Sequence, residues 1–308
     1  MKKSVVLLLG VLLTISATGT SLAATHHHHH YVKTKSAFPL HIKDQSGHWV
    51  TVQKKPVHIA SVTEGTDEIL SALVPKKDIA MVTSFASDPL YSNIVHFAKG
   101  IPAIGNANAE QVLAVHPDLV LMASYVAPGV VSQIEQTGIP VYEFTNFNSI
   151  ANIEQNIEVV GQLTGTLPKA KVIVHRMQIQ IQSFLKMDKG LVHPTVLDYS
   201  SYGFAAGRQT TVNDVIVDAG GVNVAKGLNG WQKITDEEIV KMNPQVIIDS
   251  TDDGVFLDKI AKNPALQTVS AIKHHRLYLI NSADLASVSQ FAVNAVRDLH
   301  QVLFPRHA

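Results

Sequence analysis

Five consecutive histidines, His26, His27, His28, His29 and His30, carry the most obvious metal-binding chemistry in the sequence. Neutral imidazoles gathered in one tract can bind Ni, Co, Cu or Zn ions. A tract without a fixed scaffold imposes no coordination geometry, so the alternative is an affinity tag or a solvated tail without a role. The tract therefore predicts a metal-scavenging segment, and it leaves open whether the segment is native.

The sequence contains no pattern that is typical of a catalytic site. The chain contains no cysteine, which excludes disulfides, thiolate zinc sites and a cysteine nucleophile. It has no nucleophile elbow and no paired carboxylates at active-site spacing, and segment 203–207 lacks the Lys-Ser/Thr of a phosphate-binding loop. Its 25 Lys and Arg residues balance 25 Asp and Glu residues, whereas nucleic-acid binding needs a basic surface. We therefore predict that the protein is not an enzyme and does not bind nucleic acid.

Several aromatic side chains lie near predicted loops, although only 6% of the chain is aromatic. They are Tyr199, Tyr202, Phe204 and Trp231. An aromatic wall suits a flat or bulky organic ligand such as a chelate. Tyr202 and Phe204 could instead pack inside their own lobe. The sequence thus indicates a ligand site and leaves two of its members open.

Short apolar runs that alternate with helical segments must position these side chains. The predicted strands span 57–60, 79–82, 118–122 and 140–143 in one series and 194–198, 246–249 and 276–280 in a second, and the predicted helices span 66–73, 109–115, 133–137, 212–219, 235–242 and 285–303. This alternation is typical of parallel sheets in α/β proteins. Such sheets bind ligands at the carboxyl ends of their strands, where Phe85, Tyr125 and Trp231 are expected.

One long helix is predicted between the two series. Apolar residues recur at helical spacing over 150–163, and Gly165 and Pro168 interrupt the pattern. The following helix spans 169–187, with an apolar stripe that includes Ile173, Met177 and Ile181. A helix of about 19 residues is nearly 30 Å long, which is enough to bridge two lobes.

The N-terminus has the layout of a secretory signal. Two lysines precede an apolar run over 4–15, which is too short to span a bilayer, and small residues follow up to Ala24. The alternative is a buried N-terminal helix. Without a cysteine to carry a lipid, we expect a soluble periplasmic protein with no lipid anchor. The predicted division is a signal peptide at 1–24, a flexible histidine-containing segment at 25–55, an N-terminal lobe at 56–150, a linker with the bridging helix at 151–189 and a C-terminal lobe at 190–308.

Two signatures stand at matched positions in the two lobes. The first is IGNANAEQVLAVHPDLV at 104–120, and the second comprises AGGVNV at 219–224, WQKITDEEIV at 231–240 and NPQVII at 243–248. Together they resemble the periplasmic binding proteins that serve ABC importers of ferric siderophores, haem and cobalamin. The resemblance covers residues 56–305 and implies an α/β fold: two Rossmann-like lobes with central parallel sheets, joined by a single long α-helix, with a ligand cleft between them.

The resemblance also implies where a partner would dock. In this family one glutamate on each lobe contacts arginines of the membrane permease dimer, and the motifs place these at Glu110 and Glu237. Two distant exposed carboxylates can orient a protein on a basic partner. The alternative for each is an ordinary carboxylate in the first turn of a helix, stabilised by the helix dipole.

The cargo stays open at this point. In the cobalamin-binding member aromatic side chains line the pocket, and matching its motifs places Phe85, Phe204, Trp231 and Asp284 there. Haem would need an axial ligand, for which Tyr91, Tyr125 and Tyr202 are candidates. Arg208 could hold an anionic group, or it could pair with Asp214 or Asp218. Arginines are few, which disfavours a triply charged catecholate.

The resulting hypothesis is a monomeric substrate-binding protein without a permanent cofactor. It would capture a metal chelate (an iron siderophore, haem, cobalamin, or a nickel or cobalt complex) and deliver it to a permease. The alternative is an exported metal-buffering protein that uses the histidine tract and is not coupled to transport.

Overall fold

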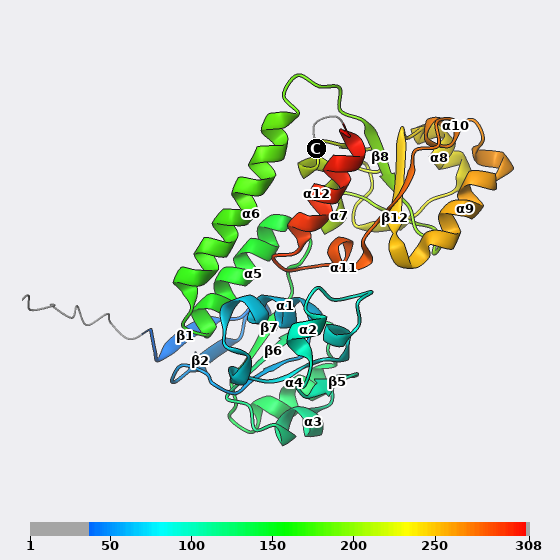
Figure 1. Ribbon diagram of the computed structural model, residues 1–308. Helices are drawn as coiled ribbons and strands as arrows, with labels where there is room; N and C mark the ends of the chain where they lie inside the picture. The colour runs from blue at the N-terminus through cyan, green and yellow to red at the C-terminus, as the bar shows by residue number, and fades with distance from the viewer. Residues whose placement is uncertain (1–36, 306–308) are drawn as a thin grey trace, which may run out of the picture. The chain divides into compact units, whose positions relative to one another are not determined.

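A computed structural model describes residues 37–305, and two separate parallel sheets organise the chain (Figure 1). The first sheet has the strand order β5-β4-β3-β6-β7. Its strands are β3 (Ile59–Ser61), β4 (Ile79–Thr83), β5 (Ala103–Ile104), β6 (Leu119–Ala123) and β7 (Val141–Phe144). Every residue of β6 is buried, as expected for a central strand covered on both faces. This sheet and its helices are called the N-terminal lobe below.

The helices of the N-terminal lobe connect its strands and cover the sheet. They are α1 (Glu64–Leu73), the 3-10 helices η1 (Lys76–Asp78) and η2 (Ser84–Ser87), α2 (Val95–Ala98), α3 (Ala109–Ala114) and α4 (Pro128–Glu135). The sequence predicts the helix before β7 at 133–137, but α4 begins earlier because Pro128 occupies its first turn, where a missing N–H costs nothing.

The second sheet has the order β10-β8-β12-β13, and all its pairs are parallel. Its strands are β8 (Thr195–Asp198), β10 (Val222–Asn223), β12 (Val246–Ser250) and β13 (Leu277–Ile280), beside an antiparallel pair of β9 (Phe204–Ala206) and β11 (Trp231–Lys233). The helical segments are α7 (Thr211–Asp218), α8 (Asp236–Met242), η3 (Thr251–Asp253), α9 (Gly254–Lys262), η4 (Pro264–Leu266), α10 (Ser270–Lys273), α11 (Ser282–Leu285) and α12 (Ala292–Leu303). These elements form the C-terminal lobe, and the two-lobe α/β prediction is confirmed.

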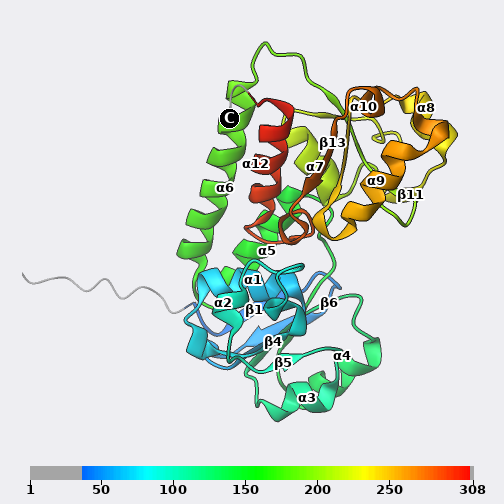
Figure 2. The same cartoon turned by 45° about the vertical axis from the view of Figure 1, so that its right-hand side comes forward.

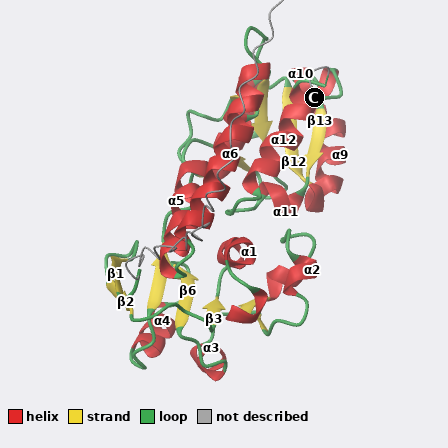
Figure 3. Ribbon diagram, turned by 60° about the vertical axis from the view of Figure 1, so that its left-hand side comes forward, coloured by secondary structure: helices red, strands yellow, loops and turns green. Residues whose placement is uncertain are grey.

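Two consecutive helices run between the sheets, as Figures 2 and 3 show. They are α5 (Ile150–Leu163) and the long α6 (Leu167–Met187). Met177 and Ile181 of the predicted stripe are buried, and α6 packs against α5, α7 and α12. Amphipathic packing along its whole length makes α6 a rigid connection rather than a flexible strand. The exact lobe boundaries at 56–150, 151–189 and 190–308 stay a prediction.

The structure also differs from the sequence-based expectation near each end of the described chain. Within the segment 25–55, which is expected to be flexible, residues 40–52 contain a hairpin of β1 (Leu40–Lys43) and β2 (Trp49–Val52). The single helix predicted at 285–303 is interrupted between α11 and α12. In the gap, backbone N–H groups of Ser289 and Phe291 donate to the hydroxyls of Ser287 and Ser289. Such local side-chain bonds compete with the helix and end it.

The same gap fastens the two lobes to each other. Glu68 of α1 is fully buried, and its carboxylate accepts hydrogen bonds from the hydroxyls of Ser287 (2.7 Å) and Ser289 (2.6 Å). Its other oxygen accepts from the backbone N–H (2.9 Å) and side-chain amide (3.1 Å) of Asn93. A Cβ at Gly65 would lie 2.5 Å from the side chain of Val288, so glycine permits this close approach. We name this contact the Glu68 clasp.

Within residues 37–305, no helix is both long enough and apolar enough to cross a membrane.

Candidate functional site

Three adjoining cavities form a cleft at the junction of the two lobes. Their volumes are about 540, 390 and 190 Å³. Ala286 lines all three, Tyr91 lines the largest and the smallest, and Trp231 lines the two smaller ones. Because neighbouring cavities share walls, we treat them as one continuous cleft. Its largest cavity alone, at about 540 Å³, lies in the range of small-molecule sites, about 300–1,000 Å³.

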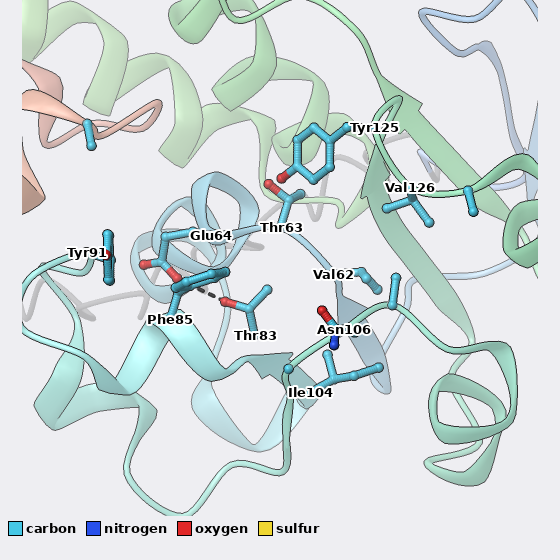
Figure 4. A pocket seen from close by; sticks show the side chains of 14 residues that line it. Val62, Thr63, Glu64, Thr83, Phe85, Tyr91, Ile104, Asn106, Tyr125 and Val126 are labelled. Carbon is cyan, nitrogen blue, oxygen red and sulfur yellow. Dashed lines mark hydrogen bonds between the residues drawn. The ribbon is translucent and has the colours of Figure 1, made fainter. Parts of the chain in front are cut away.

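The largest cavity is built from the carboxyl ends of the strands in the N-terminal lobe (Figure 4). Glu64 follows β3, Phe85 follows β4 and Tyr125 follows β6. The rings of Phe85 and Tyr91 meet edge to face, with centroids 5.3 Å apart. Phe85 and Tyr125 are 46% and 71% exposed, so both rings offer apolar surface to a ligand.

The structure brings some predicted ligand residues together and leaves others apart. Phe85, Tyr125 and Trp231 line the cleft. Tyr202 and Phe204 are absent from the walls of these three cavities. Tyr202 is 81% exposed in the loop before β9. The ammonium group of Lys233 lies over the ring of Phe204, with 5.5 Å between the nitrogen and the ring centroid. Tyr91, a candidate axial ligand by sequence, contributes to two cavities because the segment after η2 reaches the C-terminal lobe.

Arg208 and Asp284 also lie outside the walls of these three cavities. Arg208 is exposed at the end of the β9 segment, and among residues 37–305 it forms no ion pair with Asp214 or Asp218. Asp284 is buried in α11, where its Oδ1 accepts a hydrogen bond from the side chain of Asn294 (2.9 Å). Its neighbours Leu285 and Ala286 line the cleft instead. The ligand-binding roles assigned to these residues by sequence stay predictions.

A group of buried carboxylates adjoins the largest cavity. Asp67 accepts hydrogen bonds from the backbone N–H (2.9 Å) and hydroxyl (2.6 Å) of Thr83, and the same hydroxyl is 3.1 Å from Glu64 Oε2. Glu64 Oε1 is buried without a hydrogen-bond partner among the described residues. Burial, reinforced by the neighbouring Asp67 carboxylate, raises the pKa of Glu64 to about 9. The spacing of these acids in the sequence does not reveal the raised pKa, because only the packing of α1 beside the cleft removes the carboxyl groups from water.

Folding stability should therefore depend on the proton of Glu64. The folded chain holds this proton up to about pH 9, whereas the unfolded chain releases it near the ordinary pKa of 4.5. Between these values the folded state binds more protons, so the free energy of unfolding is expected to fall as pH rises. Glu64→Gln should make the free energy of unfolding depend less steeply on pH. Denaturant unfolding at several pH values between 4.5 and about 9 measures this. Glu110→Gln, at an exposed position, is the control, and identical pH slopes in the two variants would contradict the assignment.

The two predicted docking glutamates both lie exposed in the first turn of a helix. Glu110 is in α3, whose N-cap Asn108 accepts a hydrogen bond from the backbone N–H of Gln111. Glu237 is in α8, which begins with a capping box formed by Thr235 and Glu238. Hydrogen bonds from its own backbone N–H and from Thr235 lower the pKa of Glu237. Both glutamate side chains are exposed, as a docking contact requires. Their role in docking to a permease stays a prediction.

The metal-binding chemistry predicted at His26–His30 lies outside the described residues. Within 37–305, no three His, Asp or Glu side chains are grouped so that they could hold a metal ion.

Comparison with known proteins agrees with this geometry. The family described as periplasmic binding protein matches residues 59–283. An uncharacterised ABC transporter substrate-binding lipoprotein of Bacillus subtilis, YvrC, is 27% identical over 284 residues, which cover 87% of this chain and 86% of that protein. A cobalamin-binding protein of Halobacterium salinarum is 25% identical over 264 residues, 84% of this chain and 69% of that protein.

Solved structures show the same fold. The molybdate-binding protein MolA of Haemophilus influenzae has a TM-score of 0.73 at 19% identity, covering 87% of this chain and 92% of that one. The haem-binding protein RhuT of Roseiflexus sp. RS-1 has a TM-score of 0.70 at 23% identity, covering 82% of this chain and 99% of that one. With the family match over both sheets, these findings establish that the chain belongs to the periplasmic binding protein family.

Proposed function

We propose that this protein captures a metal chelate in the cleft between its lobes and delivers it to an ABC transporter permease. The observation that carries the proposal is the continuous cleft with aromatic walls from both lobes: Phe85, Tyr91 and Tyr125 from one and Trp231 from the other. Aromatic faces bury a flat or bulky chelate without covalent attachment. The relatives named as binding cobalamin and haem support this class of ligand. Binding without catalysis and without a permanent cofactor is part of the proposal.

Capture would need only small movements of the lobes. The rigid α6 and the Glu68 clasp both connect them, and opening would have to break hydrogen bonds to a fully buried carboxylate. Breaking such charge-assisted bonds is costly. We therefore propose a modest closure about the clasp rather than a wide hinge motion.

Delivery would use the exposed Glu110 and Glu237 as contacts for basic residues of the permease dimer, with the binding protein acting as a monomer. The side chains of four other predicted ligand residues would reach a ligand only after the loop before β9, β9 itself, the residues after it, or α11 moves: Tyr202, Phe204, Arg208 and Asp284. Family membership supports a location outside the cytoplasm. The cleaved signal at 1–24 and the absence of a lipid anchor stay predictions, and the Bacillus subtilis relative is named a lipoprotein.

Binding of a chelate should be visible in the fluorescence of Trp231. Titration with cyanocobalamin, haemin or a ferric siderophore is expected to quench it, and Tyr125→Ala should weaken binding of the quenching chelate about tenfold, since aromatic contacts contribute about 1 kcal/mol or more. A Trp49→Phe background removes the other tryptophan, which lies 73% exposed in the β1–β2 hairpin.

The control is Val255→Ala, at an exposed position of α9 outside the cleft walls, which should change affinity by less than about twofold. A protein that binds none of the three chelates would contradict the proposed function. Deleting 25–36 tests the metal-buffering alternative, because cleft binding should survive the deletion.

A further inference from the structure

The smallest cavity of the cleft has an acidic wall that the aromatic residues do not explain. Asp198 ends β8, and Asp249 lies near the end of the neighbouring strand β12, where Ile248 pairs with Asp198 in parallel register. Both carboxylates line the cavity of about 190 Å³, and their residues are only 4% and 3% exposed. Because Ile248 is level with Asp198, the two acid side chains leave opposite faces of the sheet and reach the same cavity at its carboxyl edge.

One oxygen of this pair lacks a hydrogen-bond partner. Asp249 Oδ1 accepts from the backbone N–H of Ser250 (2.8 Å), whereas Oδ2 is buried and has no partner among residues 37–305. Burial is the main cause that raises the pKa of Asp249 to about 8 and that of Asp198 to about 7. A buried acceptor without a partner costs free energy. A ligand group that donates a hydrogen bond into the cavity would recover that cost.

The charged residues that line the cleft also favour a ligand that donates hydrogen bonds. Across the described residues, no Lys, Arg or His lines any of its three cavities, while Glu64, Asp198, Asp249 and Asp252 do. An anionic ligand would therefore lose its hydration without gaining a cation. Trp231 borders the acidic cavity, and its ring face attracts positive charge and N–H groups.

We propose that Asp198 and Asp249 form a selectivity subsite that accepts amide N–H or ammonium groups at the edge of the ligand and rejects carboxylates. This inference rests on the proposed function and narrows its cargo. It favours chelates with a neutral, amide-rich periphery, such as amide-bearing corrinoids. It disfavours haem, whose propionates are anionic, and anionic ferric catecholates.

Two corrinoids that share a ring but differ at its edge test the subsite. Cobinamide carries amides, and cobyrinic acid carries free carboxylates. Isothermal titration at about pH 9, above the pKa values of both acids, should show cobinamide binding at least about tenfold more tightly, because like charges brought together in a dry site are strongly unfavourable. In Asp198→Asn/Asp249→Asn the ratio should fall to about threefold or less. Glu135→Gln/Asp258→Gln, at exposed positions of α4 and α9, should keep the original ratio.

Each outcome decides the proposal. Equal binding of the two corrinoids, or a preference for cobyrinic acid, would overturn the subsite while the proposed function stands. An unchanged ratio in the Asp198→Asn/Asp249→Asn variant would also overturn it, since the discrimination would then come from elsewhere. If neither corrinoid binds, the inferred ligand class is wrong, and titrations with haemin and ferrichrome then show whether chelate binding itself survives.

Discussion

Replacing His300 by alanine is expected to lower the free energy of unfolding by about 3–5 kcal/mol, because it leaves a buried carboxylate without its partner. His300 Nε2 lies 2.9 Å from Asp188 Oδ1, and both side chains are only 1% exposed. Asp188 Oδ2 already has no hydrogen-bond partner among the described residues. The imidazole also packs against Phe184 and Phe304, with ring centroids 4.8 and 5.3 Å away. The pair joins the end of α6 to α12, so its loss should loosen the bridging helix.

The control for this prediction is a surface pair on the same helix. Arg297 and Asp298 form an ion pair at 2.9 Å, but their side chains are 46% and 30% exposed. Arg297→Ala should therefore cost about 1 kcal/mol or less. Adding Asp188→Asn to His300→Ala should recover part of the loss, since a neutral amide costs less to bury than a carboxylate. Denaturant unfolding of the unmodified protein, the two single variants and the double variant measures these free energies of unfolding. Equal losses for His300→Ala and Arg297→Ala would contradict the prediction.

Uptake of the ligand is expected to fall to the background level when Glu110 and Glu237 are both replaced by lysine. Both side chains are exposed in first helical turns and lie outside the cleft walls, so affinity for the chelate should change less than about twofold. Charge reversal would turn two attractive contacts with a basic permease surface into repulsive ones. The measurement is uptake of labelled chelate by cells that carry the transporter, together with titration of the purified variant.

A matched variant separates docking from general charge effects. Glu135→Lys/Asp258→Lys makes the same change of charge at one exposed site in each lobe, in α4 and α9. It should leave uptake near the level of the unmodified protein. If the matched variant lost as much uptake, the docking role of Glu110 and Glu237 would be wrong. If the Glu110→Lys/Glu237→Lys protein lost chelate affinity, those residues would belong to ligand binding instead.

Local patterns in the sequence determine most of the architecture. Alternating apolar runs predict β3, β4, β6, β7, β8, β12 and β13, and helical spacing predicts α5 and α6 within a few residues. The capping box at Thr235 and Glu238 is also a local feature, because its bonds join residues three positions apart. Each of these depends on neighbouring residues along the chain, which a sequence shows directly.

Tertiary structure alone decides which residues face the cleft. Tyr91 and Trp231 come from different lobes and meet in one cavity. Phe204 lies outside the cavity walls although its strand β9 pairs with β11, which begins at Trp231. The helix predicted at 285–303 is broken where Ser287 and Ser289 bind Glu68, which is more than 200 positions earlier in the chain. Likewise, the buried acids Asp198 and Asp249 come to line one cavity only when β8 pairs with β12. Periodicity reports which face of an element is apolar, but burial of an acid and the convergence of loops depend on contacts between distant segments.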